Sequence, residues 1–481
     1  MSVKKNFIYS ALSGTMQYIV TLVTFPYVSR ILGVSNIGLV NFVDNTINYF
    51  LLFAMMGINL LGIREIAKTK NKPNLFRESY SNLLFIQGVF TFLILILYFI
   101  AIFTIGQFRE NVDLFLIGSA KIIFSFFLID WFYKGIENFK YITIRNIVIR
   151  IVYIITIFLF VKNKDDSIIY FSLTIGTVVI NGIINYTYSL KFVRFSFKDL
   201  SIKTYLKPFL SLGIYVILTS MYTTFNVVYL GFVSNNDQVG FYTTALKIYT
   251  IILGLFSAFT GVMLPRMSSL LAEKNVEGFQ NMLYKSFSFL LLFSFPLAIF
   301  CVIFAPQIID IMAGDGYEGA ILPMQIIMPL LIVVGLAQIL AVQILIPMRK
   351  DKVILFASIL GAIVGLVSNV ILVNKFQGVG TAFVLIVSES IVSVFYIIKV
   401  QKLGIKIPYR LIIQKFLFAI PYIVICISIC FVHLNKFATL SLGIILCFIY
   451  FIILEFFIDK NPILLNIKDK ILEKYNIKYK G

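Results

Sequence analysis

The sequence predicts an all-α membrane protein of about fourteen transmembrane helices, with two six-helix lobes related as parallel repeats and a C-terminal helix pair. Three observations favour this class: extreme hydrophobicity, apolar stretches of membrane-spanning length, and basic residues concentrated in alternate loops. Hydrophobic residues make up 60% of the 481 positions, the mean hydropathy is +0.96, and only 13% of residues are charged. A soluble domain is about half apolar and a quarter charged, so lipid is the expected solvent.

Fourteen apolar stretches are long enough to cross a bilayer, whose hydrocarbon core takes about 20 residues of helix. Because backbone groups in the core cannot bond to water, and because the stretches are too long for barrel strands, each is expected to be a helix. The first six are residues 7–29, 38–61, 80–105, 112–133, 143–161 and 168–190. After a basic loop come residues 206–233, 239–264, 284–306, 321–347, 353–373, 379–399, 409–432 and 437–458.

The basic residues predict the orientation of the chain in the membrane. Of 41 Lys and Arg, 31 lie in the termini and loops on one side and 6 in the loops on the other. Cytoplasmic loops carry the excess of Lys and Arg, so both termini are expected in the cytoplasm. The same placement, between apolar stretches, excludes nucleic acid as the partner of the net charge of +19. The tail, residues 459–481, is expected to be cytoplasmic, either as an amphipathic helix on anionic lipid or as a solvated basic segment.

An internal repeat predicts the domain organisation. Gly38 and Gly240 begin the second and eighth stretches, Arg64 and Arg266 close them, and both pairs are 202 residues apart. An even number of helices separates the two halves, so they would be parallel repeats, as in several transporter folds. The expected divisions are a lobe at residues 1–200, a second lobe at 201–405, an extra helix pair at 406–458, and the tail.

Ionisable residues within the spans are the candidate substrate-binding groups, because charges in the membrane usually face a bundle interior or a wet cavity. Lys121 lies near the midplane, Lys247 roughly 12 Å below the outer face, and Arg150 roughly 10 Å above the inner face. Together with Arg30, at the outer end of the first stretch, they predict a cationic cavity for an anionic substrate. Arg150 could instead snorkel to the headgroups, and Lys415 is expected to do so.

Two acidic residues are the candidates for ion coupling by a proton or Na⁺. Glu389 lies near the midplane of the twelfth stretch, and Asp44 lies about 9 Å below the outer face in the second. A carboxylate that gains and loses a proton is a recurrent part of transporter relays. The structural alternatives are a fixed ion pair of Glu389 with Lys121 or Lys247, and a pair between Asp44 and Lys247 across the lobe interface. Asp130 lies near the inner end of the fourth stretch, and we expect it to be a hydrated residue that caps the helix.

The sequence lacks the motifs of several classes of enzyme and metal site. There is no Gly-rich phosphate loop ending in Lys-Ser or Lys-Thr, no nucleophile elbow and no His-Glu helix pair. The single histidine and the four cysteines have no metal-ligand spacing. The longest outer loop, residues 307–320, is too small for the catalytic part of a membrane polymerase or glycosyltransferase. The sequence therefore predicts a protein that is not an enzyme and needs no cofactor.

Five motifs carry a resemblance to a known family: residues 25–33 followed by Gly38, 57–59, 62–67, 130–145, and 239–242 with Ala245 and Lys247. Together they resemble bacterial polysaccharide repeat-unit flippases (Wzx-type), of the multidrug/oligosaccharidyl-lipid/polysaccharide exporter superfamily. The longest looks like the loop between the fourth and fifth helices of that family, and the others resemble its first, second and eighth helices. The resemblance covers at least the first 350 residues and is specific in combination.

The resemblance implies the fold of multidrug and toxic-compound extrusion transporters, two six-helix lobes in a V shape. It implies transport of an undecaprenyl-diphosphate-linked oligosaccharide from the inner to the outer leaflet of the bacterial cytoplasmic membrane, by alternating access and with ion coupling, for O-antigen or capsule assembly. Membrane lipids and a polysaccharide polymerase are the further expected partners. Two rivals remain, a drug or cation antiporter of the same fold and a flippase for the lipid-linked peptidoglycan precursor. Deep cations disfavour the antiporter.

Overall fold

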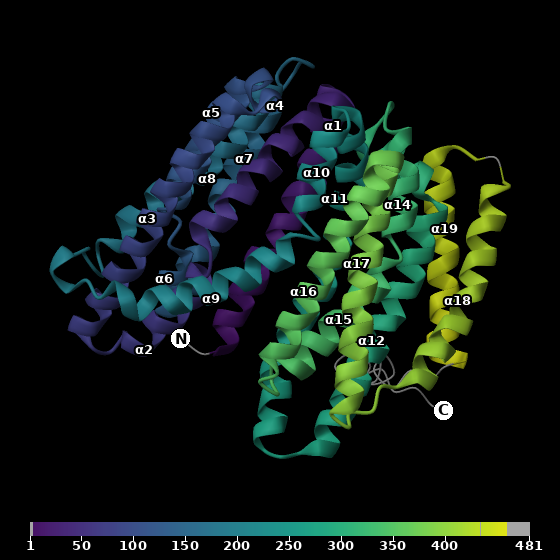
Figure 1. The fold of residues 1–481 in the computed structure, drawn as a ribbon. Coiled ribbons are helices and arrows are strands. Elements are labelled where there is room, and N and C mark those ends of the chain that lie inside the picture. Colours follow the sequence, from purple (N-terminus) through teal and green to yellow (C-terminus); the bar gives the residue numbers. More distant parts are fainter. Residues whose placement is uncertain (1–2, 433, 459–481) are drawn as a thin grey trace, which may run out of the picture.

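The computed structural model describes residues 3–432 and 434–458, and the described chain is helical throughout, without strands. The first group of helices is coloured purple to blue in Figure 1. It comprises α1 (Val3–Met55), α2 (Ile58–Thr69), α3 (Pro73–Thr104), α4 (Gly106–Glu110), α5 (Val112–Ser125), α6 (Asp130–Gly135), α7 (Phe139–Phe160) and α8 (Ser167–Ser189). We call these helices the N-lobe. The predicted tail, residues 459–481, lies outside the described residues.

The second group, which we call the C-lobe, runs from teal to green in Figure 1. Its helices are α9 (Ile202–Ser220), α10 (Phe225–Val233), α11 (Asn236–Ala272), α12 (Val276–Ile303), α13 (Ala305–Ala313), α14 (Ile321–Ile327), α15 (Leu330–Gln338), α16 (Asp351–Ser368) and α17 (Asn374–Lys402). Two helices, α18 (Tyr409–Cys430) and α19 (Lys436–Ile452), pack on its outer flank against α12 and α13. Helix α9 contacts both groups, because it packs on α1, α2 and α3 as well as on α16.

The described part of the chain contains ten helices long and apolar enough to cross a membrane, or up to twelve if each of two bent pairs forms one span. The bent pairs are α9 with α10, at 51°, and α14 with α15 and the π-helical turn that follows, at 41°. These findings confirm the all-α membrane class. The count of fourteen remains a prediction, and it depends on how two very long helical segments are divided.

These two segments, Leu12–Thr69 and Asp351–Lys402, are 58 and 52 residues long, more than twice the length that spans a bilayer. Within each segment one long helix contains one residue with non-helical backbone angles, Gly33 in α1 and Gln377 in α17. Gly33 has φ 73° and ψ 172°, a conformation that glycine adopts without a Cβ clash. Gln377 has φ 49° and ψ −124°. Each break falls between two of the apolar stretches predicted from the sequence.

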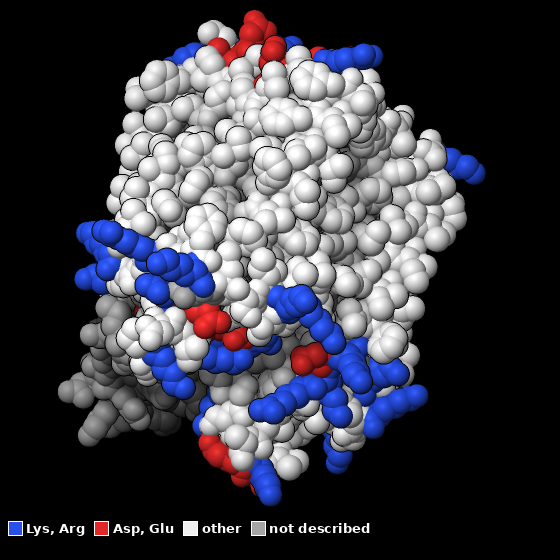
Figure 2. Space-filling view, turned by 60° about the vertical axis from the view of Figure 1, so that its left-hand side comes forward, with Lys and Arg blue, Asp and Glu red and all other residues white. Residues whose placement is uncertain are grey.

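The two lobes converge at one end of the molecule and diverge toward the other (Figure 1). Figure 2 shows Lys and Arg gathered toward the lower end, a nearly uncharged face above them, and mixed charges at the upper end. The diverging end is therefore the basic end. An uncharged band between two charged ends is the surface expected of a protein that spans a bilayer.

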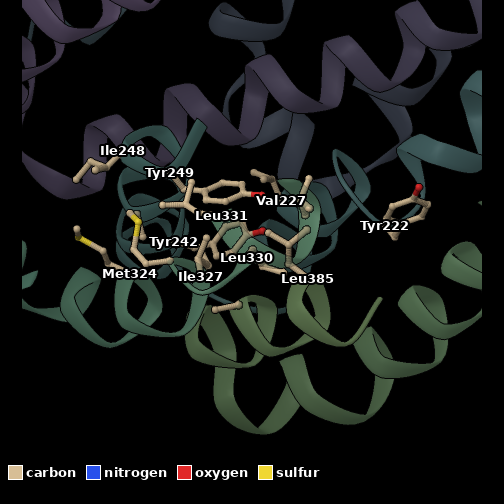
Figure 3. Packing of buried hydrophobic residues seen from close by; sticks show 14 of the residues in the cluster. Tyr222, Val227, Tyr242, Ile248, Tyr249, Met324, Ile327, Leu330, Leu331 and Leu385 are labelled. Atoms are coloured by element: carbon tan, nitrogen blue, oxygen red, sulfur yellow. The ribbon is translucent and has the colours of Figure 1, made fainter. Parts of the chain in front are cut away.

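The core of the C-lobe is built from aromatic and aliphatic side chains of α10, α11, α14, α15 and α17 (Figure 3). Tyr242, Leu330, Leu331 and Ile327 are fully buried there, with 0% of their surface exposed. Outward-facing side chains of the peripheral helices are apolar and exposed, among them Phe92 and Val148 at 64% and 54%. Exposed apolar stripes of this kind are the lipid-contacting faces of membrane helices.

Candidate functional site

Helices α1 and α11 form the main contact between the lobes, and they meet through residues at equivalent positions of the sequence repeat. A Cβ atom on Gly38 would lie 1.8 Å from the backbone oxygen of Asn236, and one on Gly240 would lie 2.4 Å from that of Val34. Val34 and Asn236 are 202 residues apart in the sequence, as are Gly38 and Gly240. The contact is therefore reciprocal, as at a twofold interface.

A hydrogen bond extends this contact by one helical turn. Asn41 Nδ2 donates to Thr243 Oγ1 at 3.0 Å, and these two residues are again 202 apart. The absence of side chains at the two glycines lets the helix backbones touch. Gly38 and Gly240, which the sequence marked as landmarks of the repeat, thus lie where the lobes are in closest contact.

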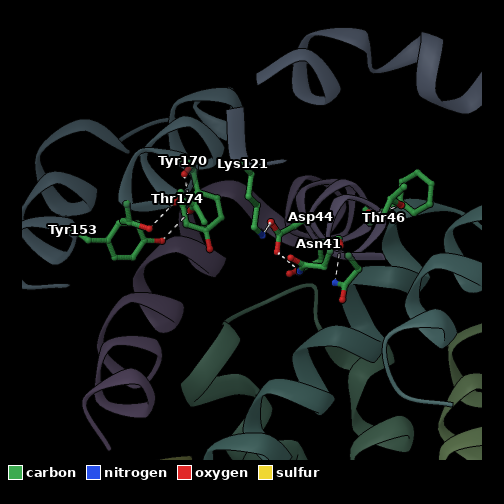
Figure 4. A network of polar contacts seen from close by, with 11 residues as sticks. Asn41, Asp44, Thr46, Lys121, Tyr153, Tyr170 and Thr174 are labelled. Atoms are coloured by element: carbon green, nitrogen blue, oxygen red, sulfur yellow. Dashed lines mark hydrogen bonds and ion pairs between the residues drawn. The ribbon is translucent and has the colours of Figure 1, made fainter. Parts of the chain in front are cut away.

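Directly below this contact, on the N-lobe side, lies the ion pair of Asp44 and Lys121 (Figure 4). Lys121 Nζ lies 2.5 Å from Asp44 Oδ1, and the side chains are 13% and 26% exposed. Asn48 donates to the other carboxylate oxygen at 3.1 Å. The structure thus brings together one predicted cavity cation and one predicted coupling group, on α5 and α1.

Lys247 reaches this centre from α11 of the C-lobe. Its Nζ lies 4.8 Å from the centroid of the Phe25 ring on α1, within the range of a cation–π contact. It also interacts electrostatically with Asp44. The side chain is half-buried and forms no ion pair in the part of the chain that the structure describes. The direct pair between Asp44 and Lys247 is therefore not formed, because Lys121 occupies the carboxylate.

A tyrosine pair backs the N-lobe centre. Tyr153 of α7 and Thr174 of α8 lie within hydrogen-bond distance, with their hydroxyls 3.1 Å apart, and Tyr170 lies beside them (Figure 4). Both tyrosines interact electrostatically with Asp44. The centre is thus a polar cluster shared by α1, α5, α7 and α8.

Arg150 lies nearer the basic end, on α7. Its Nη1 donates to the Ser13 carbonyl at 2.5 Å and its Nη2 to Gln17 Oε1 at 3.4 Å, both on α1. These contacts direct the guanidinium to the polar flank of α1 and keep it separate from the Asp44–Lys121 pair.

Arg30 lies at the converging end and joins the lobes there. Its guanidinium donates to the carbonyls of Pro26, Asp310 and Ile311, the last two near the C-terminal end of α13. A cation at the carboxyl end of a helix is favoured by the helix dipole. Tyr317 donates to the Ser29 carbonyl at 3.3 Å beside it. Arg30 thus clamps the lobes together at the converging end, five residues along α1 from Phe25, which Lys247 contacts.

Glu389 lies on α17 in the C-lobe, half-buried and apart from the N-lobe cluster. Within the described residues, no cation or hydrogen-bond donor lies in bonding range of its carboxylate, so the alternative of a fixed pair with Lys121 or Lys247 is not formed. The carboxylate interacts electrostatically with three tyrosines, Tyr222, Tyr249 and Tyr396. A lone carboxylate among tyrosine hydroxyls is suited to exchange a proton or to bind a cation.

Two buried ion pairs escaped the sequence analysis. Arg145, counted as a loop residue, is 6% exposed on α7 and lies 2.9 Å from Asp130, which Asn185 also contacts at 2.8 Å. Asp130, at the first turn of α6, therefore bonds two protein groups while 30% of its side chain stays exposed. Lys415 does not snorkel, because its Nζ lies 2.6 Å from Glu455 Oε1 in a pair whose side chains are 3% and 2% exposed. The spacing of Lys415 and Glu455 on two antiparallel helices was the available signal.

An apolar cavity of about 500 Å³ lies beside α1 and α11. Leu22 of α1 and Ile248 of α11 line it, and these residues lie one turn from Phe25 and directly beside Lys247, respectively. The rest of the wall comes mainly from apolar side chains of α12, α13 and α19. Neither Lys247 nor Phe25 lines the cavity, so the cation and the apolar space are neighbours along α1 and α11.

Comparison with known proteins supports the resemblance. Residues 3–271 match the protein family described as "Polysaccharide biosynthesis protein". A protein of Escherichia coli (strain K12) named "Putative O-antigen transporter" is 26% identical over 412 residues, covering 82% of this chain and 95% of its own. A protein of the same name from Shigella dysenteriae is 26% identical over 409 residues, covering 82% and 98%.

Solved structures share the fold. The lipid II flippase MurJ in an inward closed conformation superposes with a TM-score of 0.75 at 15% identity, covering 93% of this chain and 98% of its own. An inward-facing multidrug resistance transporter of the MATE family superposes with a TM-score of 0.61 at 14% identity, covering 84% and 96%. The chain is therefore a multi-pass membrane protein with the fold of these transporters, and it belongs to the polysaccharide biosynthesis protein family.

Proposed function

We propose that this protein is a flippase that moves an undecaprenyl-diphosphate-linked oligosaccharide repeat unit from the inner to the outer leaflet of the bacterial cytoplasmic membrane. The observation that carries the proposal is the adjacency of Lys247 and the apolar cavity. The proposed substrate carries an anionic diphosphate attached to a long isoprenoid chain. Its binding site therefore needs a cation and an apolar surface close together. Family membership and the named relatives support a polysaccharide precursor as the cargo.

The arrangement of the lobes supports uptake from the cytoplasmic side. The lobes touch through Gly38, Gly240 and the Arg30 clamp at one end, and they diverge toward the basic end (Figure 1). Basic ends face the cytoplasm, so both termini lie inside. Alternating access would then open the Gly38–Gly240 contact and close the basic end.

Ion coupling is assigned to the two acidic candidates. Glu389 has no counter-charge in bonding range, whereas Asp44 is held by Lys121. Glu389 can therefore gain or lose a proton, or bind Na⁺, without breaking an ion pair. We assign the coupling ion to Glu389. If the contact with Lys121 were broken, Asp44 would become a second carboxylate able to bind the coupling ion.

A second candidate function is favoured by one observation, the similarity to the lipid II flippase MurJ over nearly the whole chain. The cargo of that flippase is also a lipid-linked saccharide, so a cation beside an apolar cavity fits either substrate. Deletion of the gene separates them. We expect loss of surface polysaccharide with a normal cell wall, restored by the wild-type gene. Arrest of growth with lysis, and unchanged surface polysaccharide, would instead assign the peptidoglycan precursor.

A further inference from the structure

A second cavity, of about 490 Å³, lies on the N-lobe between the first turns of α7 and the last turns of α8. These are the basic ends of both helices, since the loops at 134–146 and 191–207 carry Lys and Arg. Asn138, Lys140, Tyr141, Arg145 and Tyr188 form part of its lining. The helices pack on α1, α5 and α6 of their own lobe, so this cavity is separate from the contact between the lobes.

Arg145 lines the cavity and carries buried hydrogen-bond donors that the described residues leave unused. Its Nη2 donates to Asp130 at 2.9 Å and to Asn146 at 2.8 Å. Its Nε and Nη1 have no acceptor among the described residues, although the side chain is only 4% exposed. Buried donors without an acceptor cost free energy, and a guanidinium presents such donors in the planar fork that suits a phosphate.

The rim of the cavity adds positive charge and aromatic rings. Lys140 is exposed, and Lys191 Nζ lies 5.1 Å from the centroid of the Tyr188 ring. Tyr188 stacks on Tyr141, with centroids 4.1 Å apart and planes 18° apart, and Arg145 lies 5.5 Å from the Tyr141 centroid. Basic pockets between helices at the cytoplasmic face are a recurrent form of lipid headgroup site.

The nearby carboxylates are already neutralised. Asp130 is paired with Arg145 itself. Glu137 lies 2.7 Å from Lys70, which keeps the pKa of Glu137 below its usual value. The first turn of α7 has no side-chain cap, since Asn138 bonds none of its N–H groups. A helix amino end of this kind favours an anion.

Apolar side chains line the side of the cavity away from the basic rim. Ile144, Val148 and Ile184 line the cavity, and their side chains are 49%, 54% and 37% exposed. They continue into the exposed stripe of Ile151 and Ile155 farther along α7. Arg145 lies about 9 Å along α7 from its first residue, the depth at which headgroups meet acyl chains.

We propose that this cavity binds the headgroup phosphate of an anionic phospholipid, such as phosphatidylglycerol, from the leaflet at the basic end. The Arg145 fork and the α7 amino end hold the phosphate, Lys140 and Lys191 select its net negative charge, and Ile144, Val148 and Ile184 carry the acyl chains. The site does not depend on the nature of the transported substrate.

The test uses the full chain, purified in detergent and titrated with phosphatidylglycerol or phosphatidylethanolamine while native mass spectrometry counts bound lipid. The wild type should retain phosphatidylglycerol in preference to the zwitterionic lipid. The double variant K140A/K191A should bind it about 20-fold more weakly, because each basic side chain contributes to the attraction. Its matched control, K350A/K402A, removes two exposed cations from the inner loops of the C-lobe and should bind like the wild type.

A second variant tests the fork itself. Arg145→Lys keeps the charge beside Asp130 but removes the planar donors, so it should also weaken retention while the thermal unfolding midpoint stays near that of the wild type. Equal retention of the two lipids by the wild type, or equal binding by K140A/K191A and its control, would overturn the proposal. Displacement of phosphatidylglycerol from the wild type by equimolar undecaprenyl diphosphate would also overturn it, because the cavity would then be a substrate site.

Discussion

The polar residues of the membrane interior were identified from the sequence by depth, but their partners were not. Hydropathy places Asp44, Lys121, Lys247 and Glu389 within spans because each is a charge in an apolar stretch. Which of them pair depends on how the helices rotate and pack. The Asp44–Lys121 bond of 2.5 Å joins residues 77 positions apart, and no local pattern specifies that distance. The roles assigned to these residues remain predictions.

Lys247 gives the most direct residue-scale prediction. Lys247→Ala should lower the flipping rate roughly ten-fold or more, a loss of about 1.4 kcal/mol or more in transition-state stabilisation, because the cation beside Phe25 and the apolar cavity is removed. Lys247→Arg should retain most of the activity, since a guanidinium also binds an aromatic face. Flipping is measured in proteoliposomes, with Lys375→Ala, an exposed lysine, as the control. Wild-type rates for Lys247→Ala would remove this residue from the substrate site.

Glu389→Gln tests ion coupling. The amide keeps the shape of the side chain and removes its charge, so the variant should fold normally but lose the dependence of flipping on an imposed proton or Na⁺ gradient. Asp113→Asn, a carboxylate at the start of α5, is the matched control. If the gradient dependence of Glu389→Gln matches that of the wild type, coupling passes to Asp44.

The buried pair of Lys415 and Glu455 makes a prediction about stability. Glu455→Gln leaves a buried ammonium without its carboxylate and should destabilise the protein by about 3–5 kcal/mol. The double variant Lys415→Met/Glu455→Leu should be close to the wild type, because apolar residues of similar size replace both charges. Thermal unfolding in detergent compares the three proteins. A single variant as stable as the wild type would show that the pair contributes little.

At the scale of the helices, the apolar stretches were located well and their junctions were not. The predicted stretches lie mostly in helix, because backbone groups in lipid must bond within the segment, but several of them contain short breaks, among them 38–61, 112–133, 206–233 and 321–347. The bends of 51° and 41° within two predicted spans were not foreseen. Pro329 lies at the 41° bend, and Thr223 and Thr224 lie at the 51° bend, but prolines and threonines also occur in straight membrane helices, so the sequence could not separate the two cases.

The glycine contact between α1 and α11 yields an element-scale prediction. Gly240→Ala places a Cβ 2.4 Å from the Val34 oxygen, so the helices must separate at this end. Gly261→Ala, in the same helix but with open space around it, is the matched control. We expect spin labels on the outer loops of the two lobes to move apart in Gly240→Ala only. Identical label distances in the two variants would contradict the close contact.

For the whole molecule, charge asymmetry and hydropathy predicted the class, and the repeat located the contact between the lobes. The direction in which the lobes diverge was not predictable, because it depends on how the helices of the two lobes pack against each other. The glycines at positions 38 and 240 mark the axis, but their spacing is the same whichever end is closed.

The topology is a separate prediction at this scale. A reporter that is active only in the cytoplasm, fused after Gly481, should give signal, because the basic loops place both termini inside. The same reporter inserted between Asn163 and Lys164, in the loop before α8, should be silent. The reverse pattern, with equal expression, would invert the orientation and with it the direction of transport.

The central claim is that the protein carries a lipid-linked saccharide across the bilayer, and flipping of a fluorescent undecaprenyl-diphosphate-linked oligosaccharide in proteoliposomes tests it most directly. Label in the outer leaflet is destroyed by an impermeant quencher, so flipping appears as additional quenching over time. We predict quenching beyond one leaflet with the wild type, much slower quenching with Lys247→Ala, and one leaflet only in empty vesicles. Quenching limited to one leaflet with folded wild-type protein, under every imposed gradient, would contradict the account.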